Sequence, residues 1–165
     1  MLFLYRDAFQ IATRNGYIVI LKRLYKECGG SVGNGLLKLL TCRNHYSGDS
    51  LVHIGIYFTY YLYIILIYSA CSYGNIEILK WFKDIGLNFK VLNLKGQSVV
   101  HSAAIRGQYF VLKYLYESRV QIDFRLLDSN NQTPFDIIPT RSDGIGSFDL
   151  CRQYLTDIYI CLYDD

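Results

Sequence analysis

The feature that most constrains the fold of this chain is an internal repeat with a period of 33 residues. The segments "ACSYGNIEILKWF" (70–82) and "AAIRGQYFVLKYL" (103–115) both begin with two small residues and carry a glycine four positions after the first. An apolar pattern at helical spacing follows each glycine. A period of this length is typical of stacked two-helix units, each of which covers the apolar face of the next.

A second pair of matching segments reveals an interruption of this period. "GDSLVHI" (48–54) resembles "GQSVVHS" (96–102), but these segments lie 48 positions apart rather than 33. The fifteen residues Gly55–Ser69 account for the whole excess. If they are removed, "GDSLVHI" runs directly into Ala70 and completes one regular unit.

These motifs resemble the ankyrin repeat, whose pattern is roughly G-x-T-P-L-H-x-A-A-x-x-G followed by an apolar helix and a loop. The segment "GQSVVHSAAIRG" matches it at Gly96, Ser98, Val100, His101, Ala103, Ala104 and Gly107. Asn131–Ile138 matches the Thr-Pro start of a further repeat, with Asp136 in the histidine position. Ala8–Gly30 is similar to a degenerate first repeat, with Ala12, Thr13 and Gly16 in register.

The resemblance implies an all-α ankyrin-repeat solenoid of about three to four helix-turn-helix units with a C-terminal capping helix. We expect one domain over 1–165, with repeats at about 8–30, 48–92 (with the insertion 55–69) and 96–128, and a degenerate repeat or cap at 131–160. Thr133 can cap the following helix, and Pro134 is well tolerated at the first helical position. Ser147–Tyr163 has the spacing of a final helix.

Three interpretations of Gly55–Ser69 remain open. The uncharged run from Ile54 to Cys71 has the minimum length of a membrane span, but its tyrosines lie throughout its middle rather than at its ends. The block could instead extend the first helix of its repeat. It could also be translated intron, because its Ile, Tyr, Phe and Leu composition fits AT-rich DNA and its Gly and Ser-Ala borders are compatible with splice sites. The borders and composition favour the intron hypothesis, which sequencing of the transcript would test.

The composition excludes several functional classes. A net charge of +3 is too small to indicate a nucleic-acid surface. The five cysteines are widely spaced, with no CxxC pair and no zinc-ligand pattern, so we expect reduced thiols and a cytoplasmic location, with the nucleus as an alternative. The glycine-rich segment Gly29–Gly35 lacks the Lys-Ser/Thr of a phosphate-binding loop. We expect no cofactor, no metal and no small-molecule substrate.

The candidate functional residues follow from the family resemblance. His53 and His101 hold the repeat's histidine position, which implies a structural role, so we expect no catalytic residue and no enzyme. The resemblance implies a scaffold that binds an unidentified protein partner through loop tips and first helices. The positions that map onto this surface are Tyr46, Asp49, Tyr73, Lys95, Gln97, Ile105, Arg106 and Asn130. Alternatively, the chain is an ankyrin fragment of a larger, possibly enzymatic protein, or a protein tethered to a membrane through 54–71.

Overall fold

The computed structural model describes residues 2–27, 49–140 and 146–162, and the side chains of 7–27, 61–140 and 146–162. Seven helices lie within these residues, and no strand does. The helices are α1 (Leu2–Arg14), α2 (Ile18–Glu27), α4 (Asp49–Ser72), α5 (Ile76–Asp84), α6 (Val99–Ile105), α7 (Tyr109–Glu117) and α8 (Ser147–Cys161).

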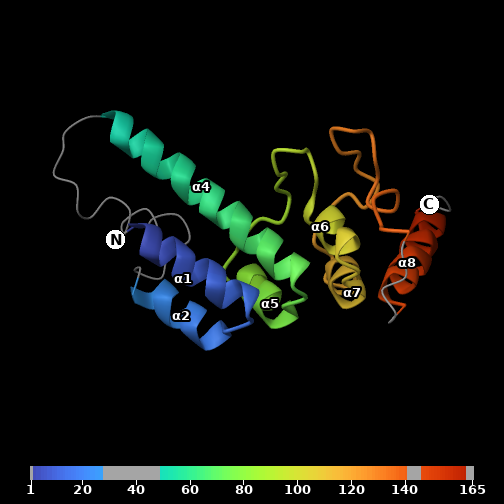
Figure 1. Ribbon diagram of the computed structural model, residues 1–165, viewed down its shortest axis with the longest axis horizontal. Coiled ribbons are helices and arrows are strands. Elements are labelled where there is room, and N and C mark those ends of the chain that lie inside the picture. The colour runs from blue at the N-terminus through green and yellow to red at the C-terminus, as the bar shows by residue number, and fades with distance from the viewer. Residues whose placement is uncertain (1, 28–48, 141–145, 163–165) are drawn as a thin grey trace.

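The helices form a linear stack of antiparallel pairs. α1 pairs with α2, α4 with α5, and α6 with α7, while α8 packs against α7 at the far end (Figure 1). α1, α4 and α6 contact one another in series and form one layer. The expected all-α repeat fold is therefore confirmed.

Small buried residues let the helices of this layer approach one another closely. Near its carboxyl end, each of the three helices carries two adjacent buried residues, three and four positions before a glycine. The pairs are Ala12 and Thr13, Ala70 and Cys71, and Ala103 and Ala104. Because these side chains are small, the helix backbones can come together without leaving a cavity.

A glycine in the left-handed conformation marks the turn inside every helix pair. Gly16, Gly74 and Gly107 have φ values between 66° and 75°, and Gly146, directly before α8, has φ 73°. A Cβ at Gly74 would lie 2.5 Å from the side-chain oxygen of Gln108, and one at Gly107 would lie 2.7 Å from Ser147 Oγ. Ser147 thus meets the preceding repeat as Gln108 does, and α8 is the second helix of a fourth repeat.

Side-chain amides tie neighbouring repeats together at these turns. Asn75 Nδ2 donates to the carbonyl oxygen of Arg14 at 3.1 Å, and Gln108 Nε2 donates to the carbonyl oxygen of Ser72 at the same distance. Each amide follows the glycine of its own repeat, and each carbonyl lies two residues before the preceding glycine. These bonds satisfy carbonyls that a helix end leaves without an intrahelical partner.

The segment Gly55–Ser69 is part of one continuous helix, α4, as the helix-extension interpretation expects. Counting back from the turn glycine, Leu66 and Ile67 occupy the positions of Val99 and Val100 in the next repeat, and all four side chains are buried. The end of the block therefore supplies the core of this repeat. Within the described residues, no helix is long and apolar enough to cross a membrane.

The first helix of the last repeat is reduced to turns. Thr133 and Asp136 form reciprocal hydrogen bonds: Asp136 Oδ2 accepts from the Thr133 amide at 2.8 Å, and the Asp136 amide donates to Thr133 Oγ1 at 3.3 Å. Residues 134–138 then form turns rather than the α-helix expected from the sequence. Pro139 explains this difference, because a proline lacks an amide hydrogen and disfavours helical conformation in the residue before it.

Candidate functional site

Two loops before the first helices share one hydrogen-bond pattern. In the loop between α5 and α6, Asn93 Oδ1 accepts from the amides of Lys95 at 2.8 Å and Gln97 at 3.1 Å. In the loop after α7, Asp128 Oδ1 accepts from the amides of Asn130 and Gln132 at the same two distances. An Asn or Asp side chain that bonds the amides two and four residues ahead fixes the shape of a turn.

The two turns are also joined to each other. The Ser129 amide donates to the carbonyl oxygen of Lys95 at 2.9 Å, and Gln97 Nε2 donates to Asp128 Oδ2 at 3.1 Å. Burial raises the pKa of the Asp128 carboxyl, but hydrogen bonds from Asn130, Gln132 and Gln97 outweigh this effect and hold the pKa below its usual value. The loop tips therefore present a connected, preorganised surface.

Buried side chains of the first helices hold the loops in place. His101 Nδ1 accepts from the Ser98 amide at 3.1 Å, and Nε2 lies 3.2 Å from the carbonyl oxygen of Gln132. This geometry assigns the hydrogen of the neutral ring to Nε2. His101 is fully buried, as a structural role requires.

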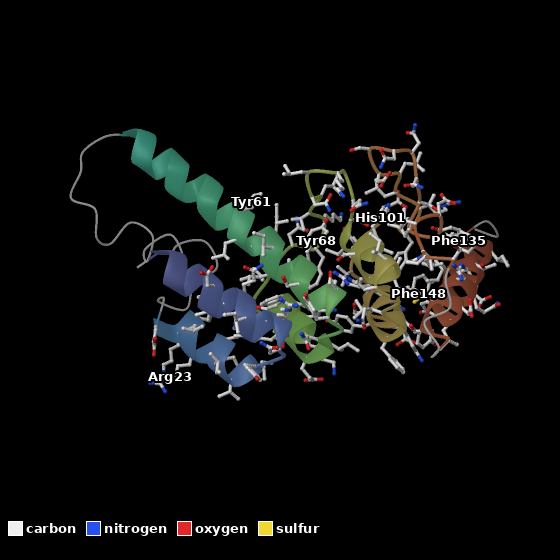
Figure 2. The ribbon with its side chains drawn as sticks, viewed as in Figure 1. Arg23, Tyr61, Tyr68, His101, Phe135 and Phe148 are labelled. Atoms are coloured by element: carbon white, nitrogen blue, oxygen red, sulfur yellow. The ribbon has the colours of Figure 1, made fainter. Side chains whose placement is uncertain are left out.

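Tyr68 contacts a backbone carbonyl of one loop as His101 contacts that of the next loop (Figure 2). Its hydroxyl contacts the carbonyl oxygen of Gln97, which is equivalent to Gln132, and donates to that of Val91 at 2.9 Å. Tyr68 lies six residues before Gly74, as His101 lies six residues before Gly107. The sequence pattern assigned this position to His53, whose side chain lies outside the described residues. Counting from the glycine would have identified Tyr68.

Exposed leucines project from the loops. Leu94 is 89% exposed, Leu127 is 53% exposed, and Leu92 is about half-exposed. Lys95 and Asn130, both predicted as contacts, are exposed next to them at equivalent positions of the two turns. Leu94 was recognisable in the sequence as an apolar residue inside a polar turn, whereas Leu92 and Leu127 were not singled out.

The predicted positions at the far ends of the first helices are also accessible. Arg106 caps α6 and is exposed, and the preceding Ile105 is half-buried. Tyr73, the equivalent of Arg106 in the preceding repeat, is 41% exposed, and the Arg14 guanidinium lies 4.8 Å from its ring centre. A cation and an aromatic ring at this distance attract each other, so Tyr73 is partly held by the first repeat.

The remaining predicted residues differ from these. The Gln97 side chain bonds both Asp128 and Asn93, at 3.1 Å each, so it serves the loop-to-loop connection. Tyr46 lies outside the described residues. Asp49 begins α4, but its side chain is not described. Lys95, Ile105, Arg106, Tyr73 and Asn130 therefore define the described part of the predicted surface.

The described residues offer no cluster of three or more metal-ligating side chains. Burial raises the pKa of the Cys71 thiol well above its usual value, so this side chain is a poor nucleophile. Burial also lowers the pKa of His101, while the Gln132 carbonyl and the Asp128 charge oppose this shift. Both groups contribute to packing or hydrogen bonding within the stack.

Comparison with known families agrees with this architecture. A family model of ankyrin repeats, in three copies, matches residues 66–158, which is more than half of the chain. The protein belongs to the ankyrin-repeat family, whose members are generally protein–protein interaction modules. The match begins at Leu66, inside the block 55–69, in agreement with the structural register of α4. No curated protein shows significant similarity to the chain.

Proposed function

We propose that this protein is a non-catalytic scaffold that binds a protein partner through its loop tips and first helices. The observation that carries the proposal is the exposure of Leu94 on a turn that hydrogen bonds hold rigid. Covering an exposed leucine with a partner is favourable because its apolar surface leaves water. A rigid turn loses little conformational entropy on binding. Lys95 beside it can provide polar contacts at the rim.

Arg106 is the second anchor of this surface. Its guanidinium is exposed at the end of α6, and arginine is among the residues that most often dominate binding energy. Replacing Arg106 by alanine removes no described hydrogen bond of the fold, so we expect weaker binding and almost unchanged stability.

The proposal can be tested by quantitative affinity capture with the full chain. Proteins captured by wild type are compared with those captured by Leu94→Asp and Arg106→Ala, with Lys22→Ala on α2 as the matched surface control. The proposal expects a set of proteins that both variants lose and the control retains. A set that is identical for all four proteins, each shown to be folded by circular dichroism, would contradict it.

We also propose a cytoplasmic location, with the nucleus as an alternative, since buried Cys71 and Cys151 act as apolar core residues. Fractionation of cells that express the full chain tests this. Recovery of the protein in a secretory or membrane fraction would overturn it.

A further inference from the structure

A groove next to the proposed binding surface runs along the loops that follow α5 and α7. It has a volume of about 800 Å³ and lies between two loop segments, 89–92 and 119–126. An adjoining hollow of about 340 Å³ continues it toward Lys83 and shares Phe89 and Lys90 with it. None of the six predicted partner-binding residues whose side chains are described lines either cavity.

The floor and the rim of this groove have different chemistry. Phe89 and Phe124 form a floor that is almost fully buried, so the apolar surface open to a ligand comes mainly from Tyr116, which is 39% exposed, and from half-exposed Leu92. The charged side chains of the two hollows are Lys83, Lys90, Arg119, Arg125 and Asp123. Four cations and one carboxylate give the groove a formal charge of +3, which equals that of the whole 165-residue chain.

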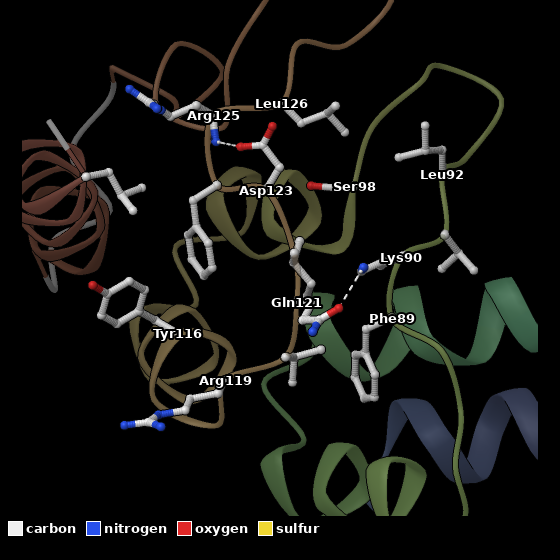
Figure 3. Close-up of a pocket in the computed structure, with 15 residues that line it drawn as sticks. Phe89, Lys90, Leu92, Ser98, Tyr116, Arg119, Gln121, Asp123, Arg125 and Leu126 are labelled. Carbon is white, nitrogen blue, oxygen red and sulfur yellow. Dashed lines mark hydrogen bonds between the residues drawn. The ribbon is translucent and has the colours of Figure 1, made fainter. Parts of the chain in front are cut away.

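The cations are spread along the groove rather than gathered at one point. Figure 3 shows Arg119 and Arg125 at opposite ends of the loop segment 119–126, with Lys90 reaching across from the other segment to Gln121. Lys90 Nζ donates to Gln121 Oε1 at 3.0 Å. A compact anion would engage only one of these cations, whereas an elongated ligand can meet several.

The spread of the cations along the groove suits a peptide in extended conformation. Side chains of such a peptide alternate between its two faces, so apolar residues can contact the floor while acidic ones reach the cations.

We propose that this groove binds an extended acidic peptide segment of a partner protein, in which acidic and apolar residues alternate. Charge complementarity selects the acidic side chains, and the aromatic floor selects the apolar ones. The groove shares half-exposed Leu92 with the loops, whereas its four cations lie outside the predicted loop-tip residues.

The test uses fluorescence anisotropy with the full chain and three labelled peptides of about ten residues, long enough to follow the groove in extended form. The first alternates Glu and Leu, the second alternates Lys and Leu, and the third alternates Glu and Ser. The proposal expects binding of the Glu-Leu peptide that is at least about tenfold tighter than binding of either other peptide, and that weakens as salt rises. Equal binding of the Glu-Ser peptide would reduce the groove to a nonspecific anion surface and overturn the proposal.

Charge reversal locates the binding site. The double variant Lys90→Glu with Arg119→Glu should lose at least about tenfold in affinity for the Glu-Leu peptide. The matched control is Lys22→Glu with Lys26→Glu on α2, which changes the net charge equally and should bind like wild type. Leu92→Asp, which keeps all four cations, should also weaken binding.

Two outcomes would contradict the groove as a peptide site. One is equal affinity of the groove variant and the α2 control, both folded by circular dichroism. The other is displacement of the peptide by single-stranded RNA at lower concentration than by unlabelled peptide. Arg106→Ala serves as a separate control, since it should leave peptide binding unchanged whether or not the loop-tip surface functions as proposed.

Discussion

At the scale of single residues, equivalent positions keep a backbone conformation even where the side chain changes. Gly86 follows its repeat's second helix with φ 79°, and Arg119, 33 residues later, has φ 51°. The left-handed region costs a residue with a Cβ about 1–2 kcal/mol. Arg119 therefore carries strain that the fold imposes through its period.

Replacing Arg119 by glycine should relieve this strain. Glycine is more flexible in the unfolded chain, which offsets part of the gain, so we expect a net stabilisation of about 0.5–1 kcal/mol. Thermal and urea unfolding measure it. Arg119→Ala removes the same side chain but keeps the Cβ, and so it should bring no comparable gain. If the alanine variant were as stable as the glycine variant, backbone strain would not be the cause.

His101 predicts a pH dependence of stability. Burial holds its folded pKa below the ordinary value of 6.5. Below about pH 6.5 the unfolded chain therefore binds more protons at this residue than the folded chain does, and stability falls with falling pH. We expect wild type to lose more stability than His101→Gln between about pH 7.5 and about pH 5. Denaturant melts at both pH values measure this, and parallel losses in the two proteins would show that His101 is not the titrating group.

At the scale of elements, α4 contains two segments suited to the same place. Leu51–Ile54 precedes Leu66–Ser69 by the fifteen residues of the block, and both present two aliphatic residues followed by a hydrogen-bonding ring. The structure uses the second segment, through buried Leu66 and Ile67 and the bonds of Tyr68. Removal of Gly55–Ser69 would bring the first into this register, with His53 at the position of Tyr68.

A chain that lacks residues 55–69 should therefore fold, with helical circular dichroism and a cooperative melt. Its dependence on single residues should also change. Tyr68→Ala should destabilise the full chain, whereas His53→Ala should matter more in the shortened chain than in the full one. An unfolded shortened chain would disprove the equivalence of the two segments. Whether the block is translated intron stays a prediction, which sequencing of the transcript tests.

The repeats could be predicted from the sequence because Gly74 and Gly107 are spaced by one undisturbed period. The fourth repeat was only partly recognised. The loop before Asn131 is longer by two residues, and Pro139 replaces the expected helix by turns, so the glycine of this repeat, Gly146, falls outside the period. Tyr68 was missed because the match of 48–54 to 96–102 placed His53 at this position, whereas the structure sets the register by distance from Gly74.

The candidate site was less predictable than the fold. The family pattern located the loop tips, and Lys95, Asn130 and Arg106 are exposed there. The pattern predicted Gln97 as a partner contact, but it could not reveal that the side-chain amide of Gln97 is used to join one loop to the next. The cationic groove was not predicted, because Lys90 and Arg119 become neighbours of one cavity only through stacking.

At the scale of the whole molecule, stability depends on contacts between successive repeats. α8 covers α7 through fully buried Leu155, while Leu150 on the same helix is 53% exposed. In a linear stack each repeat interacts only with its neighbours. Damage at one end should therefore be felt most strongly near that end.

Leu155→Ala should lower the free energy of unfolding by about 2–5 kcal/mol, the usual cost of truncating a buried leucine. Hydrogen exchange followed by mass spectrometry should show faster exchange in α7 and α8 than in wild type, with a smaller change in α1 and α2. Leu150→Ala is the exposed control and should change little. Uniform acceleration along the whole chain would mean that the stack opens as one unit.

The long α4 has a consequence for how such proteins change over evolutionary time. Its contacts with the neighbouring repeats are set by distance from Gly74, at its carboxyl end. Added residues at the other end do not move those contacts, because they only lengthen the part of α4 that extends beyond the other labelled helices in Figure 1. The amino-terminal end of a first helix is thus a position where insertions and deletions of whole turns can be tolerated while the rest of the fold stays the same.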